Sequence, residues 1–280
     1  MNASVIGKSV EQFVDFLFSR FRGAFDAFSV ALGSVVELLE QALAALPYPV
    51  MLAIFVGLAL WRRGVFFAVF VGAAMSCIHY MGLWNQTVAT LALVLAATLL
   101  SLVAGVPLGI WGARSDRVGV ALRSVLDFMQ TMPAFVYLIP AVILFGLGRV
   151  PAVIATIVFA MPPVVRLTTL GIRQVRPELI EAGRSFGSTE AQLLWKIQLP
   201  NALPSIMAGV NQTIMMALSM VVVASMIGAG GLGEYVLSGI QRLDIGIGFE
   251  GGLGVVLLAI VLDRLTESFG VRKPRKSKAK

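Results

Sequence analysis

Long runs of apolar residues, separated by short polar stretches, fill most of the chain after position 47. An α-helix needs roughly 18 to 20 apolar residues to cross about 30 Å of hydrocarbon. Because the runs are continuously apolar and do not alternate, they predict helices and not the strands of a membrane barrel. The pattern predicts seven spanning helices, over Tyr48 to Trp61, Val65 to Trp84, Thr87 to Ala113, Met129 to Leu147, Pro151 to Leu170, Leu203 to Gly228 and Phe249 to Phe269.

The first 46 residues carry a different pattern, with charged residues placed between two apolar stripes. Three acidic groups, Asp26, Glu37 and Glu40, make a membrane crossing unfavourable. We therefore expect amphipathic interfacial helices that lie on the bilayer, and no removable signal peptide. The two stripes at helical spacing are Val10, Phe13, Val14, Leu17, Phe18, Phe21, Phe25 and Phe28, and then Leu32, Val35, Val36, Leu39, Leu43 and Leu46.

The composition agrees with a membrane protein. Of 280 residues, 58% are hydrophobic and only 13% are charged, and the mean hydropathy is +0.89. A water-soluble globule normally has about a quarter of its residues charged, so that class is excluded. The net charge of +7 comes from short basic clusters between apolar runs and from the tail. This placement is typical of cytoplasmic loops beside anionic lipid and does not indicate a nucleic-acid partner.

The basic clusters also predict the orientation of the chain. They lie at Arg62 and Arg63, at 114–123, at 166–196 and from Arg272 onward, which are alternate connections between the predicted spans. Since basic loops stay in the cytoplasm, we expect the N-terminal region outside and the C-terminus inside. The predicted regions are therefore 1–46 (external, interfacial), 47–86 (peripheral spanning helices), 87–270 (core) and 271–280 (basic cytoplasmic tail).

Few residues could support chemistry. Cys77 is the only cysteine and His79 the only histidine, so no disulfide, metal cluster or nucleophile triad can be assembled. The segment GAGGLG, Gly228 to Gly233, satisfies GxGxxG formally, but it follows an apolar helix and not a strand. We interpret Gly228, Gly230, Gly231 and Gly233 as a tight external turn. No Walker lysine loop occurs, so any ATP hydrolysis belongs to another polypeptide.

Prolines and glycines punctuate the spans. Gly105 and Gly109 form a GxxxG pair with Pro107 between them, a spacing that allows two helices to approach closely. Further prolines interrupt two spans, at Pro133 and Pro140 and at 162–163. Packing alone can explain such residues, but several broken helices in one chain favour a moving transporter over a static anchor. Carboxylates lie near span ends, as in the cluster of Asp263, Arg264 and Glu267, which disfavours a proton- or sodium-coupled carrier.

One polar segment, residues 177–200, interrupts the apolar pattern on the predicted cytoplasmic side. Pro177 suits the first turn of a helix, and Gly187 suits its end, followed by Ser188 as the N-cap of a second helix over Ala191 to Leu199. We expect a compact helical projection whose small residues let another protein's surface approach. An ordinary solvated loop is the alternative, but loops of this length that are helical and internally capped are less often mere connections.

This segment resembles the EAA signature, EAA-x3-G-x9-I-x-LP, of permease subunits of binding-protein-dependent ABC importers. The matching residues keep the spacing throughout, with Gly183 in place of the second alanine: Glu181, Ala182, Gly183, Gly187, Ile197, Leu199 and Pro200. From about Thr87 to Arg264 the chain is similar to the glycine betaine, proline betaine and choline branch, for example in LDFMQTMPAFVYLIPAVILFGLG and MAGVNQTIMMALSMVVVASMIGAGGLG.

The resemblance implies an all-α, polytopic fold with a type I ABC importer permease core in a bacterial cytoplasmic (inner) membrane. It implies a homodimer of permeases, a cytoplasmic ATPase dimer that uses ATP and Mg²⁺, and an external substrate-binding protein. The chain itself would be non-catalytic and bind no cofactor. Segment 177–200 would couple to the ATPase, and Met132, Phe135 and Tyr137 would line the path or, alternatively, pack in the core. An ion-coupled secondary transporter or a channel for small zwitterionic solutes is the alternative function.

Overall fold

The computed structural model describes the backbone of residues 5–270 and, within that range, the side chains from Ser19 onward together with Gln12 and Phe16. The predicted tail 271–280 and the side chains of the first apolar stripe up to Phe18 therefore lie outside the described residues. Within this range the fold is entirely helical, as predicted. The elements are α1 (Val5–Ala44), α2 (Tyr48–Arg63), α3 (Val65–Tyr80), α4 (Trp84–Arg114), α5 (Asp116–Thr131), α6 (Ala134–Phe145), α7 (Arg149–Ala160), α8 (Pro162–Arg173), α9 (Pro177–Ser185), α10 (Glu190–Gln192), the π-helix η1 (Leu193–Gln198), α11 (Leu199–Ser225), α12 (Leu232–Arg242) and α13 (Ile245–Gly270).

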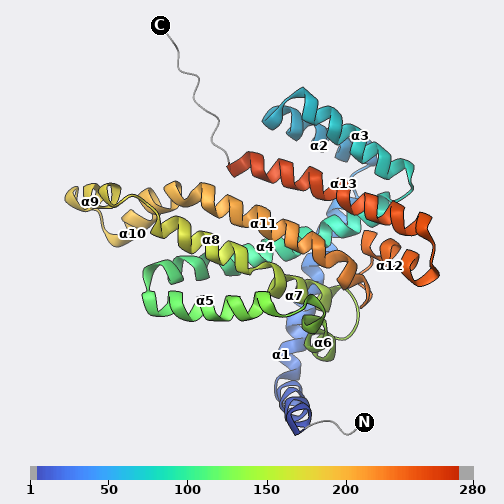
Figure 1. Ribbon diagram of the computed structural model, residues 1–280, viewed down its shortest axis with the longest axis horizontal. Coiled ribbons are helices and arrows are strands. Elements are labelled where there is room, and N and C mark those ends of the chain that lie inside the picture. Colours follow the sequence, from blue (N-terminus) through green and yellow to red (C-terminus); the bar gives the residue numbers. More distant parts are fainter. Residues whose placement is uncertain (1–4, 271–280) are drawn as a thin grey trace.

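The centre of the molecule is α8, which lies between α4 and α11 (Figure 1). Glycines bring all three backbones together. A Cβ atom added at Gly105 or Gly109 of α4 would lie 2.5 Å from Val164 or 2.6 Å from Thr168 of α8. One added at Gly209 of α11 would lie 3.0 Å from the Cα of Val164. The predicted close approach at the GxxxG pair is confirmed, and α4 runs unbroken through Pro107.

Five helical segments in residues 5–270 are long and apolar enough to cross a membrane, or six if the bent pair α5 and α6 counts as one. Four of them match predicted spans: α4, α7 with α8, the helix ending in α11, and α13. The predicted spans over α2 and α3 are shorter. Each has 16 residues, or about 24 Å at 1.5 Å per residue, and the two form a hairpin packed against α13.

The predicted span over Met129 to Leu147 is interrupted at Pro133, as the prolines within it indicated. The chain bends by 97° between α5 and α6, at Met132 and Pro133. Met132 adopts extended φ and ψ because the residue before a proline disfavours the helical region. Pro140, by contrast, lies inside α6 without ending it. The apolar run thus continues through two differently directed helices.

The N-terminal region forms α1, which is kinked at Phe21, so its two helical parts meet within the first predicted stripe and not between the two stripes. Residues Ser19–Ala44 are long and apolar enough to span a membrane, which our charge argument did not anticipate. In Figure 1, however, α1 runs steeply across the direction of α11 and α13. Its second half packs on α4 and α7 through the buried Leu32 and Val36. A membrane crossed by α11 and α13 would therefore not be crossed by α1, so the interfacial placement remains our prediction.

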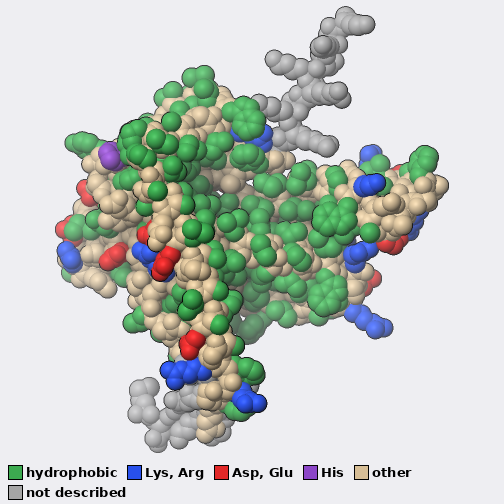
Figure 2. Space-filling model, turned by 180° about the vertical axis from the view of Figure 1, so that it is seen from behind, with side chains coloured by type: hydrophobic (Ala, Val, Ile, Leu, Met, Phe, Trp, Pro, Cys, Tyr) green, Lys and Arg blue, Asp and Glu red, His purple; other side chains and the backbone are tan. Residues whose placement is uncertain are grey.

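Apolar side chains cover a broad area of the face seen in Figure 2, and Lys and Arg side chains gather at its right-hand end. That end carries α9 and α10, at the left in Figure 1. The opposite end holds α12, a helix that the sequence pattern did not predict as a separate element. Gly228, Gly230 and Gly231 precede it with φ of 85°, 75° and 78°, so the predicted tight turn is confirmed.

Candidate functional site

The polar segment 177–200 folds into a helical projection at one end of the molecule (Figure 1). Helix α9 begins with Pro177 and carries Glu178 in its first turn, where negative charge complements the helix dipole. Gly187 follows its end with a φ of 76°, as predicted. The N–H of Ser188 donates to the carbonyl oxygen of Gly183 at 3.0 Å. A free carbonyl group in the last turn of α9 is thus hydrogen-bonded, as in a Schellman motif.

The second arm of the projection differs from its prediction in two respects. The N-cap is Thr189 and not Ser188, and its hydroxyl and the side chain of Gln192 form a reciprocal capping box with the backbone. The arm is also not a separate helix, because α10 and η1 continue directly into α11. The wider π turn precedes Pro200, which has no N–H to donate. The side-chain amide of Asn201 donates to the carbonyl oxygen of Ile197 at 2.7 Å.

Gly183 has an internal role. It is buried, and an added Cβ atom would lie 2.5 Å from Ile197 and 2.6 Å from Leu193, both in η1. The departure from alanine in the EAA pattern therefore lets α9 lie directly against η1. This differs from our expectation that the small residues all serve the approach of another protein. Glu181, Ala182 and Gly187 remain exposed on the outer side of the projection.

Two aromatic residues of the projection were missed by the sequence analysis. Phe186 is 91% exposed and Trp195 is 68% exposed, although both lie in the most polar segment of the chain. Arg184 of α9 and Glu190 of α10 form an ion pair at 3.1 Å that links the two arms. The sequence did hold one signal of an exposed aromatic contact: Phe186 is an isolated phenylalanine directly before Gly187, the glycine that ends α9. Large exposed aromatic side chains on a capped, rigid support are typical anchors of protein–protein contacts.

The three residues predicted to line a path do not share one surface. Tyr137 is buried in a cluster with Leu138 and Met220, and Met132 packs against that cluster. The Tyr137 hydroxyl donates to the carbonyl of Met129 and so closes the bend between α5 and α6. These contacts favour the packing alternative for both residues. Phe135 is 54% exposed and remains available to a path or a partner.

At the opposite end, the glycine turn fastens three elements together. The N–H of Leu232 donates to Thr90 Oγ1 of α4 at 2.8 Å, and an added Cβ at Gly231 would lie 2.5 Å from the same oxygen. An added Cβ at Gly233 would lie 2.4 Å from the carbonyl oxygen of Val221 in α11. Gly231 and Gly233 thus allow close packing here, as Gly105 and Gly109 do between α4 and α8.

Comparison with known proteins gives one consistent family. Residues 105–273 match the family model described as binding-protein-dependent transport system inner membrane component. The chain is 51% identical over 261 residues to the glycine betaine/proline betaine transport system permease protein ProW of Escherichia coli (strain K12), covering 93% of this chain and 74% of ProW. It is 46% identical over 272 residues to the glycine betaine transport system permease protein OpuAB of Bacillus subtilis (strain 168), covering 96% of each.

Solved structures agree on the fold. A structure titled as an inward-facing conformation of the MetNI methionine ABC transporter aligns with a TM-score of 0.57 at 23% identity, covering 67% of this chain and 92% of that chain. Because identity is this low, the likeness speaks for the fold alone. With the family model covering more than half of the chain and relatives near 50% identity, the chain belongs to the inner membrane components of binding-protein-dependent transport systems.

Proposed function

We propose that this chain is the permease subunit of an ATP-driven importer for glycine betaine or a related quaternary amine. The names of ProW, OpuAB and the glycine betaine/carnitine transport permease protein GbuB of Listeria monocytogenes, 48% identical over 264 residues, support this substrate class. ATP binding and hydrolysis belong to a separate cytoplasmic ATPase pair. A second copy of this chain completes the path, and an external binding protein delivers the solute.

The observation that carries the mechanism is the continuity of the projection with the core. The arm α10–η1 runs without a break into α11, which packs on α8. A push on the projection would therefore be transmitted along α11 into the helix interface that the glycines keep narrow. Two packed helix arrangements of similar free energy would make such an interface a switch between inward-facing and outward-facing states.

The proposed orientation in the membrane follows from the placement of the basic residues. The projection carries Arg184 and Lys196, and the nearby ends of α2, α4 and α8 carry further arginines. Placing this end in the cytoplasm satisfies the preference of basic segments for that side and brings the exposed Glu181, Ala182, Gly187 and Phe186 to the ATPase. The external end is then that of α12 and the glycine turn.

Replacing Glu181 by lysine tests the coupling role. We expect Glu181→Lys to abolish ATP-driven uptake of radiolabelled glycine betaine, because it reverses a charge on the surface offered to the ATPase. Membrane insertion and the affinity of the complex for its binding protein should be unchanged. Glu37→Lys, the same charge change at an exposed position of α1, serves as the control and should retain uptake. Normal uptake by Glu181→Lys would refute the coupling role.

A further inference from the structure

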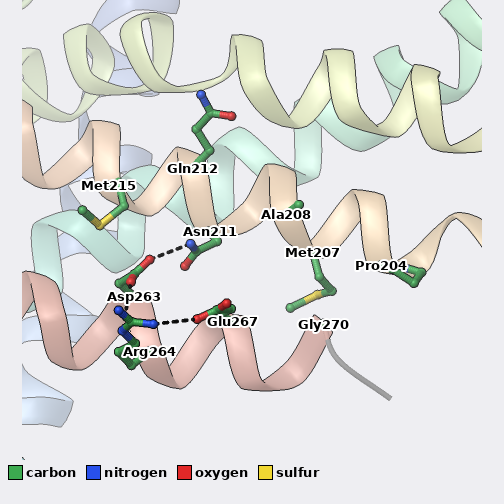
Figure 3. Close-up of a pocket in the computed structure, with 10 residues that line it drawn as sticks. All are labelled: Pro204, Met207, Ala208, Asn211, Gln212, Met215, Asp263, Arg264, Glu267 and Gly270. Carbon is green, nitrogen blue, oxygen red and sulfur yellow. Dashed lines mark hydrogen bonds and ion pairs between the residues drawn. The ribbon is translucent and has the colours of Figure 1, made fainter. Parts of the chain in front are cut away.

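A groove lined by polar and apolar side chains lies between α11 and the second half of α13 (Figure 3), toward the end of α11 that continues from the projection. The groove is open on one side and has a volume of about 560 Å³. The proposed coupling mechanism does not use it. The residues that matter for its chemistry are Met207, Asn211 and Met215 of α11 and Asp263, Arg264 and Glu267 of α13.

The two carboxylates of the groove are held differently. Glu267 forms an ion pair with Arg63 at the end of α2, so much of its charge is already balanced. Asp263 accepts a hydrogen bond from Asn211 Nδ2 at 2.7 Å, and Asn211 in turn accepts one from the hydroxyl of Thr266. This chain of hydrogen bonds fixes the direction of the Asp263 carboxylate without supplying a positive charge to it.

Arg264 is the loosely held member of the cluster. Its guanidinium lies 3.9 Å from Asp263 and 3.5 Å from Glu267, and its side chain is 52% exposed. Charge-assisted hydrogen bonds to arginine are normally about 2.7 to 2.9 Å long. Arg264 therefore makes no close bond that it would lose by turning toward a carboxylate that enters the groove.

The depth of the groove argues that it faces water. Asp263 lies seven residues before Gly270, the last residue of α13, or about 10 Å along the helix. Ionisable side chains at membrane depth face the bundle interior or an aqueous cavity, and not lipid. Since the Arg264 side chain is half exposed on the single chain, its charge requires water or another polar surface beside these helices, and not lipid.

We propose that this groove is a low-affinity binding subsite for a zwitterionic quaternary amine near the cytoplasmic end of the path, an inference that rests on the proposed function. Arg264 holds the carboxylate of the solute, and Asp263 faces its quaternary ammonium. That ammonium has no proton to donate, so it is attracted by the charge of a carboxylate and by polarisable surfaces such as the thioether of Met215, which also lines the groove. The adjacent opposite charges of Asp263 and Arg264 match a solute whose own charges are close together.

Binding can be measured directly on the purified transporter complex without the external binding protein. Saturation-transfer NMR would follow the methyl signals of glycine betaine, which has a carboxylate, and of choline, which has none. We expect Arg264→Gln to weaken glycine betaine binding about tenfold while choline binding persists, because only the first ligand uses the guanidinium. Arg264→Lys should restore much of the glycine betaine binding, and Asp263→Asn should weaken both ligands.

Arg117→Gln is the matched control, since Arg117 is an exposed arginine of α5 outside the groove; it should bind both ligands like the wild type. Unchanged glycine betaine binding by Arg264→Gln, or no saturable binding of either ligand by the wild type, would overturn the subsite. Uptake assays separate the two proposals. If the wild type takes up glycine betaine and Arg264→Gln takes it up equally well, the subsite alone is refuted. If the wild type does not transport glycine betaine, the proposed function is refuted.

Discussion

At the scale of single residues, glycine has two separate uses in this protein. In the core, Gly109 lets α4 touch the backbone of α8, where an added Cβ would lie 2.8 Å from the carbonyl oxygen of Val165. In the projection, Gly183 lets α9 lie on flexible side-chain ends of η1, which can shift. A substitution should therefore be far more damaging at Gly109 than at Gly183, since backbone atoms cannot move aside.

The glycine in the core gives a stability prediction. Gly109→Val should separate α4 from α8 and destabilise the protein by roughly 1 to 3 kcal/mol, as overpacking usually does. The measurement is the thermal unfolding midpoint of the purified permease in detergent. Gly57→Val is the control, because no atom lies within 4 Å of a Cβ added at Gly57 of α2. Equal midpoints for the two variants would contradict the packing role of Gly109.

The exposed aromatic of the projection gives a binding prediction. Phe186→Ala should weaken association with the ATPase by about 2 kcal/mol, or roughly 30-fold, if Phe186 fills a pocket of the partner. Affinity of the purified permease for the isolated ATPase is the quantity to measure. Phe66→Ala removes an equally exposed phenylalanine, 92% accessible, in α3 outside the projection and should have no effect. Undiminished affinity of Phe186→Ala would remove this residue from the proposed contact.

At the scale of elements, the important feature is where helices join and where they break. The π turn at Leu193–Gln198 joins the projection to α11 despite Pro200, whereas Pro133 separates α5 from α6 by a 97° bend. The difference lies in the preceding residues. Before Pro200 the wider turn keeps helical dihedral angles, as Leu199 has φ −61° and ψ −44°, but Met132 before Pro133 is extended at φ −74° and ψ 136°.

A flexible insertion at this junction tests the lever. Two glycines placed between Gln198 and Leu199 should leave stimulated ATP hydrolysis largely intact and reduce glycine betaine uptake strongly, because the push no longer reaches α11. Hydrolysis and uptake would be measured on the same reconstituted preparation. The same insertion between Ala45 and Leu46, in the turn after α1, should leave both activities unchanged. Uptake that persists in proportion to hydrolysis would show that continuity of the helix is not required.

At the scale of the whole molecule, the two ends differ in character. One end carries the projection and the arginines at the ends of α2, α4 and α8, and the other carries α12, with Arg242, and the turn to α13, where Leu243 is 89% exposed. Only the distribution of basic residues assigns these ends to the two sides of the membrane. The assignment matters because the ATPase and the binding protein must meet opposite ends.

Labelling with a membrane-impermeant maleimide checks this assignment. In a Cys77→Ser background, Ala191→Cys on α10 should react only in inside-out vesicles, and Leu243→Cys should react only from the external side, since basic segments prefer the cytoplasm. Both positions are exposed, so access is limited by the membrane and not by packing. The Cys77→Ser chain without a new cysteine gives the background. Reaction of Ala191→Cys from the external side would invert the orientation.

The sequence by itself determined the helical membrane class, the position of the polar projection and the close approach at Gly105 and Gly109. Each of these depends on local pattern: the length of apolar runs, the capping residues and the spacing of small residues. Only the tertiary structure decided that α5 and α6 diverge, that Gly183 lies under Ile197, and that Asp263 and Arg264 meet Asn211 beside a cavity. Those features join residues 14 to 52 positions apart or depend on the direction taken after a bend, and helical periodicity carries no information about which faces of different helices will meet.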